Sequence, residues 1–457
     1  MNKHNTAATG SISFREKVAY GVGDIGFNFY WANISAFLLI FYTDVFGISA
    51  AAAGTMMLVT KIVDAFTDPL MGAIADRTKS RFGKFRPYIL WLALPMAAAG
   101  VLTYSTPDIS EGGKLIWAYA TYTLMMLIYT AINIPYSALS GVMTADSQQR
   151  TTLISFRFIG GFTGGILVTY LTPKLVPWLG QGDDVLGWQL TMLIFGVAAA
   201  LMFLITFWFT RERINPINQI PDSAWRDIAD LKDNKPWLVL FALALIIMIC
   251  ITMRAGSGVY YFKYFVQRPE LVGEFLSSYM FALALGAAST PLMTRFIDKK
   301  RLMILLMSLT GVLSISLYFV PPQQVGLIFA INLAIGFVLG PKSPLAFSMY
   351  ADTADYNEWR TGRRATAMTF SAATFSQKLG GAIASAAIGW LLALLGYVAN
   401  EQQSAASQDG IVLLISVIPG VIALLSAFVM RFYSLDNQQL AKIQYELAER
   451  KAAAKSY

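Results

Sequence analysis

Long apolar segments recur along this chain, and they constrain its fold more than any other feature. A window of about 19 residues finds twelve of them, at 18–43, 50–75, 88–106, 115–139, 151–173, 187–210, 236–264, 272–295, 302–320, 325–350, 364–396 and 408–434. Each is about as long as a helix that crosses the hydrocarbon core of a bilayer. Only 14% of the residues are charged, against about a quarter in soluble proteins. The sequence therefore predicts an all-α membrane protein with twelve transmembrane helices.

The positions of lysine and arginine predict the orientation of these helices. Most lie near the termini or in even-numbered connections, whereas odd-numbered connections hold little beyond Lys114, Lys174 and Arg268. Because basic loops stay on the cytoplasmic side, we expect both termini and the polar stretch 211–235 to be cytoplasmic. This topology explains the net charge of +8, so we expect no nucleic-acid partner. The polar N-terminus lacks the short apolar core of a cleaved signal peptide.

The two halves of the chain resemble each other. PYSALSGVMTAD (135–146) aligns without gaps with PKSPLAFSMYAD (341–352), and GAIADRTKSRFGK (72–84) has a weaker counterpart in MTRFIDKKR (293–301). Repeats of six helices around a central loop are typical of transporters that bind their substrate near the bilayer midplane, between the repeats. The predicted domains are a six-helix bundle over 1–210, a cytoplasmic loop over 211–235, a second bundle over 236–434 and a cytoplasmic tail over 435–457.

The second apolar segment carries three charged residues, Lys61, Asp64 and Asp68. Their spacing places all three on one face of a helix. A charge at the centre of a membrane helix costs about 2.5–3.5 kcal/mol on insertion scales, so this face must point into protein. Two close carboxylates repel each other, which either a retained proton or a bound cation relieves. A salt-bridge network that locks helices together is the alternative, and we favour a cation-coupling site.

Other polar residues interrupt the apolar segments. Asp24 and Asn28 share a face of the first segment, and Thr130 and Asn133 precede Pro135 in the fourth, where the proline loosens backbone hydrogen bonding. Four basic residues also lie within apolar segments, namely Arg157, Arg254, Lys342 and Lys378. Lys378 lies near the middle of a long segment and is a candidate ligand donor. Arg157 and Lys342 lie nearer to segment ends, where the side chain can also reach the interface.

Several classes of function are excluded by what the sequence lacks. The only histidine, His4, lies in the N-terminal tail, and Cys250 is the only cysteine. We therefore expect no metal site, no intramolecular disulfide and no enzyme activity. GFTGG (161–165) and RTGRR (360–364) lack the spacing of a phosphate-binding loop, so an ATP-driven pump and an organic cofactor are not expected.

A charged loop follows the second apolar segment. Asp76, Arg77, Arg81 and Lys84 lie in it, and positive-inside topology alone explains the basic residues. A second interpretation is a cytoplasmic gate that braces one conformation of an alternating-access cycle. Asp352 and Arg363 of the second half are its predicted partners.

Six motifs together point to a known family. They are YGVGD (20–24), FYTDVFG (41–47), DAFTDPLMGAIADRTKSRFGKFRP (64–87), YTAINIPYSAL (129–139), ADTADYNEWRTGRR (351–364) and QKLGGA (377–382). On these motifs the chain resembles, over essentially its whole length, the glycoside–pentoside–hexuronide:cation symporters of the major facilitator superfamily. The resemblance implies the major facilitator fold, with two pseudo-symmetric six-helix halves.

The resemblance also implies roles for individual residues. In the melibiose permeases of this family, the two carboxylates of the long motif bind the coupling cation, so the match carries this role to Asp64 and Asp68. The match also places Thr67, Thr130 and Thr374 at positions that assist cation binding, and the sugar-contacting positions of the family fall on Asn28, Asn133, Ser137, Arg157 and Lys378. To these we add Asn133 as a candidate cation ligand, and Asp24 and Tyr136 as candidate sugar-binding residues. Asp24 is an acid one turn before Asn28 that has no match in the family pattern. Melibiose permeases have aspartates at the positions of Asn28 and Asn133 and a tryptophan at Ser137, so we expect a different sugar.

The predicted function is import of a glycoside, pentoside or small oligosaccharide, driven by H⁺ or Na⁺ through alternating access. Export of amphiphilic compounds by cation antiport on the same fold is the alternative. The resemblance implies a monomer in the bacterial inner membrane whose partners are a small glycoside, a monovalent cation and lipid.

Overall fold

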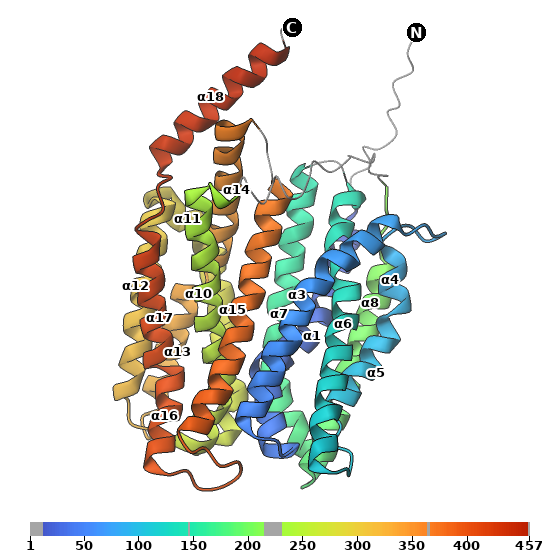
Figure 1. Cartoon of the computed structure of the whole chain (residues 1–457), viewed down its shortest axis with the longest axis vertical. Helices are drawn as coiled ribbons and strands as arrows, with labels where there is room; N and C mark the ends of the chain where they lie inside the picture. Colours follow the sequence, from blue (N-terminus) through green and yellow to red (C-terminus); the bar gives the residue numbers. More distant parts are fainter. Residues whose placement is uncertain (1–11, 145–146, 214–230, 363–365, 456–457) are drawn as a thin grey trace. The chain divides into compact units, whose positions relative to one another are not determined.

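The computed structural model describes residues 12–144, 147–213, 231–362 and 366–455, and these ranges contain helices and no strands (Figure 1). Ten of the described helices are long and apolar enough to span a membrane, and a pair bent by 56°, Phe14–Ala36 with Leu38–Val45, makes up to eleven. This confirms the predicted all-α membrane class. By internal contacts the chain forms two compact units. Unit 1 comprises residues 1–219, 268–277 and 389–402, and unit 2 comprises 220–267, 278–388 and 403–457.

Unit 1 is built from the first half of the chain. Its α-helices are α1 (Phe14–Ala36), α2 (Leu38–Ile40), α3 (Ala50–Arg77), α4 (Arg86–Trp91), α5 (Ala93–Thr103), α6 (Glu111–Met143), α7 (Ser147–Gly180) and α8 (Asp184–Phe209), with the π-helix η1 (Phe41–Val45) after α2 and the short 3₁₀-helix η3 (Pro269–Leu271). α1 begins at a capping box, in which Ser13 and Glu16 satisfy each other's backbone N–H groups. α1 packs most extensively on α7 and α8.

Unit 2 contains most of the second half of the chain. Its elements are α10 (Lys235–Tyr260), η2 (Tyr261–Phe265), α11 (Val272–Phe296, whose first turns belong to unit 1), α12 (Lys299–Ser316), η4 (Leu317–Phe319), α13 (Val325–Leu339), α14 (Lys342–Thr361), α15 (Thr366–Leu394, whose last turns belong to unit 1), α16 (Ala405–Ile415), α17 (Val417–Met430) and α18 (Asn437–Lys455). The predicted polar tail is largely α18. A hydrogen bond joins it to α14, in which the indole N–H of Trp359 on α14 donates to Glu446 on α18 over 2.6 Å. The predicted domain boundaries stay a prediction.

The predicted third segment, 88–106, is where the helix count differs from the prediction. It forms two short helices, α4 and α5, separated by a break at Leu92, and α5 is only 11 residues long. Neither helix is long enough to span a bilayer alone. Twelve spanning helices are therefore not fully confirmed by the described residues.

Both copies of the sequence repeat place a proline within a membrane-spanning stretch. Pro135 lies inside α6, and Pro341 follows the end of α13 and precedes α14. The span that includes α13 and α14 runs from Val325 to Thr361, so Lys342 lies near its middle. The interpretation of Lys342 as a residue near a segment end stays a prediction, because the last turns of α14 are charged and include Asp355 and Glu358. The two prolines differ in their effect, since α6 continues unbroken through Pro135 whereas Pro341 lies between α13 and α14.

A buried arginine stabilises another helix break. α16 and α17 are separated at Ser416, and Pro419 has no N–H to donate to the carbonyl of Ile415. Arg254 of α10, which is 3% exposed, donates from its terminal nitrogens to this carbonyl oxygen over 2.9 Å and to Asn332 Oδ1 over 3.1 Å. Arg254 therefore satisfies a carbonyl that the proline leaves without its helical donor.

Glycines bring α1 and α7 into backbone contact. A Cβ built on Gly160 would lie 2.0 Å from the carbonyl oxygen of Gly21, and one built on Gly164 would lie 2.8 Å from Ile25 O. Real side chains do not fit at such distances, so the close approach requires glycine. It also brings the polar residues of α1 against α7, which positions the site described below.

Replacing Gly160 by alanine tests this packing. The added methyl group overlaps the α1 backbone, so we expect a loss of about 1–3 kcal/mol in the free energy of unfolding, as for other overpacked cores. Thermal unfolding of the purified protein in detergent measures it. Gly141→Ala on α6 is the control, because a Cβ there meets no atom within 4 Å. Equal melting temperatures for the two variants would contradict the proposed close approach.

Candidate functional site

The charged face of α3 lies where the sequence predicts it. Lys61 and Asp64 are buried, and Asp64 is 3% exposed, whereas Phe66 on the opposite face is 74% exposed. Asp68, one turn after Asp64, is partly buried. The described structure therefore confirms that this face points into protein and the apolar face points outward. We call Asp64 and Asp68 the carboxylate pair.

One hydroxyl on α6 joins the two members of the carboxylate pair. Thr130 Oγ1 contacts Asp64 Oδ1 at very short range and lies 3.2 Å from Asp68 Oδ1. A threonine hydroxyl has one proton, so it can donate to only one of these oxygens at a time. Three oxygen atoms from α3 and α6 thus converge at this point. Oxygen clusters of this kind suit a monovalent cation or an additional proton.

Two further residues border the carboxylate pair. The Lys61 ammonium lies 5.2 Å from the centre of the Trp31 ring on α1, within the range of a cation–π interaction. The Thr67 hydroxyl donates to the backbone carbonyl of Asp64 over 3.0 Å. This bond holds Thr67 close to the pair but does not direct its hydroxyl at the carboxylates, so its predicted role as a ligand remains a prediction.

A second polar group connects α1, α6 and α7. Arg157 Nε of α7 donates to Asp24 Oδ1 of α1 over 2.8 Å, and its terminal nitrogen donates to Ser137 Oγ of α6 over 3.0 Å. Asn28 Nδ2 donates to the backbone carbonyl of Asp24 over 3.0 Å and lies 3.4 Å from Asp24 Oδ2. We call these four residues the arginine group. The side chains of Arg157 and Asp24 are 29% and 14% exposed, so both remain partly accessible.

Glycine packing sets the geometry of the arginine group. A Cβ on Gly161 would lie 2.7 Å from Asp24 Oδ2, and one on Gly164 would lie 2.8 Å from the Cβ of Asn28. The two polar side chains of α1 therefore occupy space that any larger residue of α7 would fill. From the sequence, GFTGG (161–165) was considered only as a phosphate-binding loop, whose spacing it lacks. Its glycines actually make room for a carboxylate and an amide.

Tyr136 packs against Arg157 of the arginine group. Its ring is fully buried, stacks on the Tyr20 ring with centroids 4.7 Å apart, and lies 5.1 Å from the Arg157 guanidinium carbon. Its hydroxyl donates to the Tyr20 backbone carbonyl over 2.5 Å. The ring thus positions Arg157, while its predicted direct contact with a sugar remains a prediction.

The two polar groups share helix α6. Thr130, Asn133 and Ser137 are spaced three and four residues apart, so they lie along one stripe of the helix. Thr130 contacts the carboxylate pair at one end of this stripe, and Ser137 contacts Arg157 at the other. Pro135 lies between the two contacts inside the continuous helix, where it removes one backbone hydrogen bond. A change in the contacts of one polar group can therefore affect the other group through α6.

The other predicted ligands lie in unit 2. Thr374 and Lys378 are one turn apart on α15, where Thr374 is exposed and Lys378 is partly buried. Their predicted roles in cation and sugar binding stay predictions, because the two units are described separately.

The predicted cytoplasmic gate is only partly described. Arg363 lies outside the described residues, and so does the side chain of Asp76. Arg77 and Arg81 are exposed, and Asp352 of unit 2 forms an ion pair with Lys299 over 2.7 Å. The sequence analysis missed Glu212, whose carboxylate accepts the backbone N–H groups of residues 84–86 over 2.8–3.0 Å. Glu212 lies in a stretch that reads as a polar linker, so no local signal identified it.

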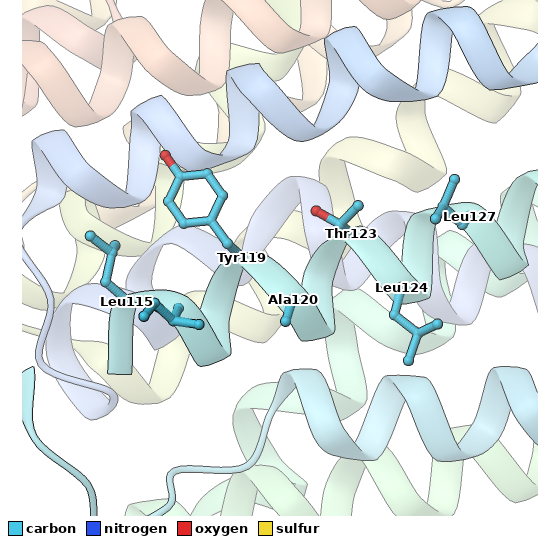
Figure 2. Close-up of a pocket in the computed structure, with 7 residues that line it drawn as sticks. Leu115, Tyr119, Ala120, Thr123, Leu124 and Leu127 are labelled. Atoms are coloured by element: carbon cyan, nitrogen blue, oxygen red, sulfur yellow. The ribbon is translucent and has the colours of Figure 1, made fainter. Parts of the chain in front are cut away.

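An open hollow on α6 has a different character. Figure 2 shows Leu115, Tyr119, Ala120, Thr123, Leu124 and Leu127 along it. Its side chains are mostly aliphatic, and Thr123 shares a 3.3 Å hydrogen bond with Thr60 of α3. A hydroxyl-rich solute would find few hydrogen-bond partners here, so we place the candidate site at the two polar groups.

Comparisons with known proteins agree with the geometry. The sequence model of the family described as MFS/sugar transport protein matches residues 19–437. The chain is 38% identical to the inner membrane symporter YicJ of Escherichia coli K12 over 96% of both chains, and 35% identical to the isoprimeverose transporter of Lactiplantibacillus pentosus, over 97% of this chain and 94% of the relative. The crystal structure of a D-xylose-proton symporter shares the fold, with a TM-score of 0.68 at 15% identity over 92% of this chain and 97% of that one.

The ion pair of the arginine group gives a stability prediction. Removing one partner leaves the other partly buried without a compensating charge. Asp24→Asn and Arg157→Gln should therefore each lower the free energy of unfolding by about 1–3 kcal/mol. The loss is smaller than for breaking a fully buried ion pair, because both side chains are partly accessible. The double variant should cost less than the sum of the two. Thermal and denaturant unfolding in detergent provide the double-mutant cycle.

The exposed ion pair of Lys174 with Glu274 in the same unit is the control for this cycle. Lys174→Gln should leave the melting temperature unchanged. Additive effects of Asp24→Asn and Arg157→Gln would show that their contact contributes nothing.

Proposed function

The chain belongs to the MFS/sugar transport protein family and is a multi-pass membrane transporter, and from this premise we propose that it imports a glycoside or pentoside together with a monovalent cation, H⁺ or Na⁺. The carboxylate pair is the cation site, and the arginine group binds the sugar. The observation that carries the proposal is the shared stripe of α6, on which Thr130 contacts the first group and Ser137 the second. Relatives named as symporters and as an isoprimeverose transporter support it.

The charges of unit 1 support a cation site. The two polar groups and the adjacent Lys61 hold three carboxylates, Asp24, Asp64 and Asp68, and two basic residues, Lys61 and Arg157. Lys174, farther along α7, is already paired with Glu274. When all five are ionised, the apolar interior of this unit lacks one positive charge. A single bound monovalent cation supplies it, and burial makes such compensation far more valuable than in water.

The arginine group has the chemistry that sugar hydroxyls need. The Asp24 carboxylate accepts hydrogen bonds, the Arg157 guanidinium donates them, and Asn28 and Ser137 can do both. Arg157 and Asp24 are accessible enough for a solute to exchange contacts with them. A polar surface of this kind favours a hydroxyl-rich solute over the amphiphilic cargo of an exporter.

Coupling follows from the geometry of α6. A cation between Asp64 and Asp68 replaces the hydrogen bonds between the Thr130 hydroxyl and these carboxylates. A sugar competes with Ser137 for the hydrogen bond that the Arg157 guanidinium donates. Because Pro135 removes a backbone hydrogen bond between these contacts, the two ends of the stripe can adjust at low cost. Cation and sugar then favour the same arrangement of α6, and alternating access carries both inward. One charge moving inward gains about 2.3 kcal/mol per 100 mV, which supports roughly a 50-fold gradient of a neutral sugar.

Neutralising the carboxylate pair should separate transport from coupling. In proteoliposomes with an imposed cation gradient, Asp64→Asn and Asp68→Asn should each abolish accumulation of a labelled glycoside above equilibrium, while sugar exchange at equal concentrations persists. The control is Asp183→Asn, at the exposed start of α8, which should accumulate normally. Normal uphill uptake by either carboxylate variant would refute the assignment of the cation site.

The hydroxyl of Thr130 should set the affinity for the cation. Thr130→Val keeps the shape of the side chain but removes the oxygen, so the cation concentration for half-maximal sugar uptake should rise about tenfold, which corresponds to about 1.4 kcal/mol. Uptake measured across a series of Na⁺ concentrations and pH values gives this number and identifies the cation. Thr123→Val, two turns earlier on α6, should leave it unchanged. The same cation dependence in all three proteins would exclude Thr130 as a ligand.

A further inference from the structure

The motif FYTDVFG (41–47) lies outside the two polar groups. Its first five residues form the π-helix η1, and Gly47 follows with a φ of 83°, in the left-handed region that glycine adopts readily. Short π-helices are rare and are frequently found at functional sites. The second half of the chain has the π-helix η2 at the corresponding place, directly after α10. The fourth residue of η1 is an acid, Asp44, whereas the fourth residue of η2 is Tyr264.

Asp44 binds a segment from far along the chain. Residues 389–402 belong to unit 1 and include the last turns of α15, although most of this helix belongs to unit 2. The Tyr397 hydroxyl donates to Asp44 Oδ1 at very short range, and the Asn400 amide donates to the Asp44 backbone carbonyl over 2.5 Å. The backbone of Asn400 has a φ of 59°, which asparagine adopts more readily than most residues. This turn therefore directs two donors at one residue of η1.

The last turns of α15 also contact α3 directly. A Cβ built on Gly389 would lie 2.2 Å from the carbonyl oxygen of Ala50, so the two backbones touch. One residue later, the Trp390 indole N–H donates to the Thr55 hydroxyl over 3.0 Å. Hydrogen bonds and a glycine contact thus join residues 389–400 to η1 and α3. We call the residues of this contact the α15 anchor, and they are Asp44, Thr55, Gly389, Trp390, Tyr397 and Asn400.

The α15 anchor differs from the core of unit 1 in that it is polar and partly open to solvent. Trp390 and Asn400 are exposed, and Asp44 and Tyr397 are partly buried. The net stabilisation from each such hydrogen bond is modest, because water can replace either partner. Contacts of this kind open at low cost, unlike buried apolar packing. Since α15 continues into unit 2, the anchor decides whether the end of this helix moves with α3 or with the rest of α15.

The position of the α15 anchor in the chain relates it to transport. Asp44 follows the first apolar segment, Thr55 lies near the start of the second, and residues 397–400 lie between the eleventh and the twelfth. The distribution of basic residues predicts that these odd-numbered connections face away from the cytoplasm. In alternating access this face opens to admit the sugar and closes before the sugar is released inward. A contact that is polar, small and reversible suits the closed state of such a face.

We propose that the α15 anchor is a latch that holds the non-cytoplasmic face closed, with Asp44 as its central acceptor. This inference rests on the function proposed above and assigns residues to one step of its cycle. Opening breaks the hydrogen bonds from Tyr397 and Asn400 to Asp44, and water takes their place. Closing of the latch competes with entry of outside sugar. A weaker latch therefore raises the fraction of open molecules and with it the apparent affinity for outside sugar.

Uptake kinetics of a labelled glycoside in right-side-out membrane vesicles test the latch. Asp44→Ala and Tyr397→Phe each remove one partner of the same hydrogen bond. Each should lower the KM for outside sugar about fivefold, because the loss of one hydrogen bond shifts the population of closed molecules by about this factor. The double variant should resemble Asp44→Ala alone. A contact that only stabilises the fold would instead lower kcat and the melting temperature and leave KM unchanged.

The matched control is a second hydrogen bond between a tyrosine and an aspartate. Tyr318 donates to Asp409 Oδ1 over 3.1 Å, and both residues belong to unit 2. Tyr318→Phe and Asp409→Ala should keep the KM of the wild type. An unchanged KM in Asp44→Ala and Tyr397→Phe, or the same decrease in the two control variants, would overturn the latch.

A second measurement needs no sugar and separates the latch from the proposed function. When Cys250, the only cysteine of the chain, is replaced by alanine, Thr55→Cys places a single thiol beside the Trp390 indole. A membrane-impermeant maleimide added outside the vesicles should react with this thiol about fivefold faster when Asp44→Ala is also present. An equal reaction rate would overturn the latch. Faster labelling without cation-driven uptake of any glycoside by the wild type would support the opening of the latch and contradict the proposed function.

Discussion

A carboxylate in the apolar interior of a membrane protein must be compensated, and this constraint governs unit 1. Asp64 is almost completely buried on α3, with Asp68 one turn away and the Thr130 hydroxyl between them. Lys61 can neutralise only one of the two charges. In the proposed function, an exchangeable cation compensates the remaining charge, as coupling requires. A fully compensated network would be more stable and could not drive transport.

The helix packing of unit 1 connects the carboxylate pair to the arginine group. Gly21 and Gly160 allow α1 and α7 to touch, which brings Asp24 to Arg157, and Ser137 joins Arg157 to α6. The same helix returns to the carboxylate pair through Thr130. Small residues at one interface thus position large polar residues at another, and Pro135 leaves α6 able to respond to both.

Periodicity was enough to predict some of these features. The spacing of Lys61, Asp64 and Asp68 placed them on one inward face of a helix, as the structure confirms. The sequence also identified Asp24 and Arg157 as polar residues within apolar segments, but it could not pair them. They are separated by more than a hundred residues, and their contact depends on glycines whose role appears only when two backbones meet.

Other features depended on tertiary structure in the same way. Glu212 binds three backbone N–H groups of the loop after α3, yet it lies in a stretch whose composition predicts only a linker. Tyr136 belongs to a motif that predicts sugar contact, but its ring is buried against Tyr20. Hydropathy alone did not show that α14 continues past the apolar residues to Thr361. Burial and helix continuation are decided by neighbours that a local pattern does not contain.

The central claim is that the oxygens of Asp64 and Asp68 hold one exchangeable cation in the absence of sugar. Equilibrium binding of Na⁺, together with proton release from the purified protein in weakly buffered detergent solution, measures it most directly. The account predicts one cation bound per chain in the wild type and none when both residues are replaced by asparagine. One cation still bound per chain in that double variant would contradict it.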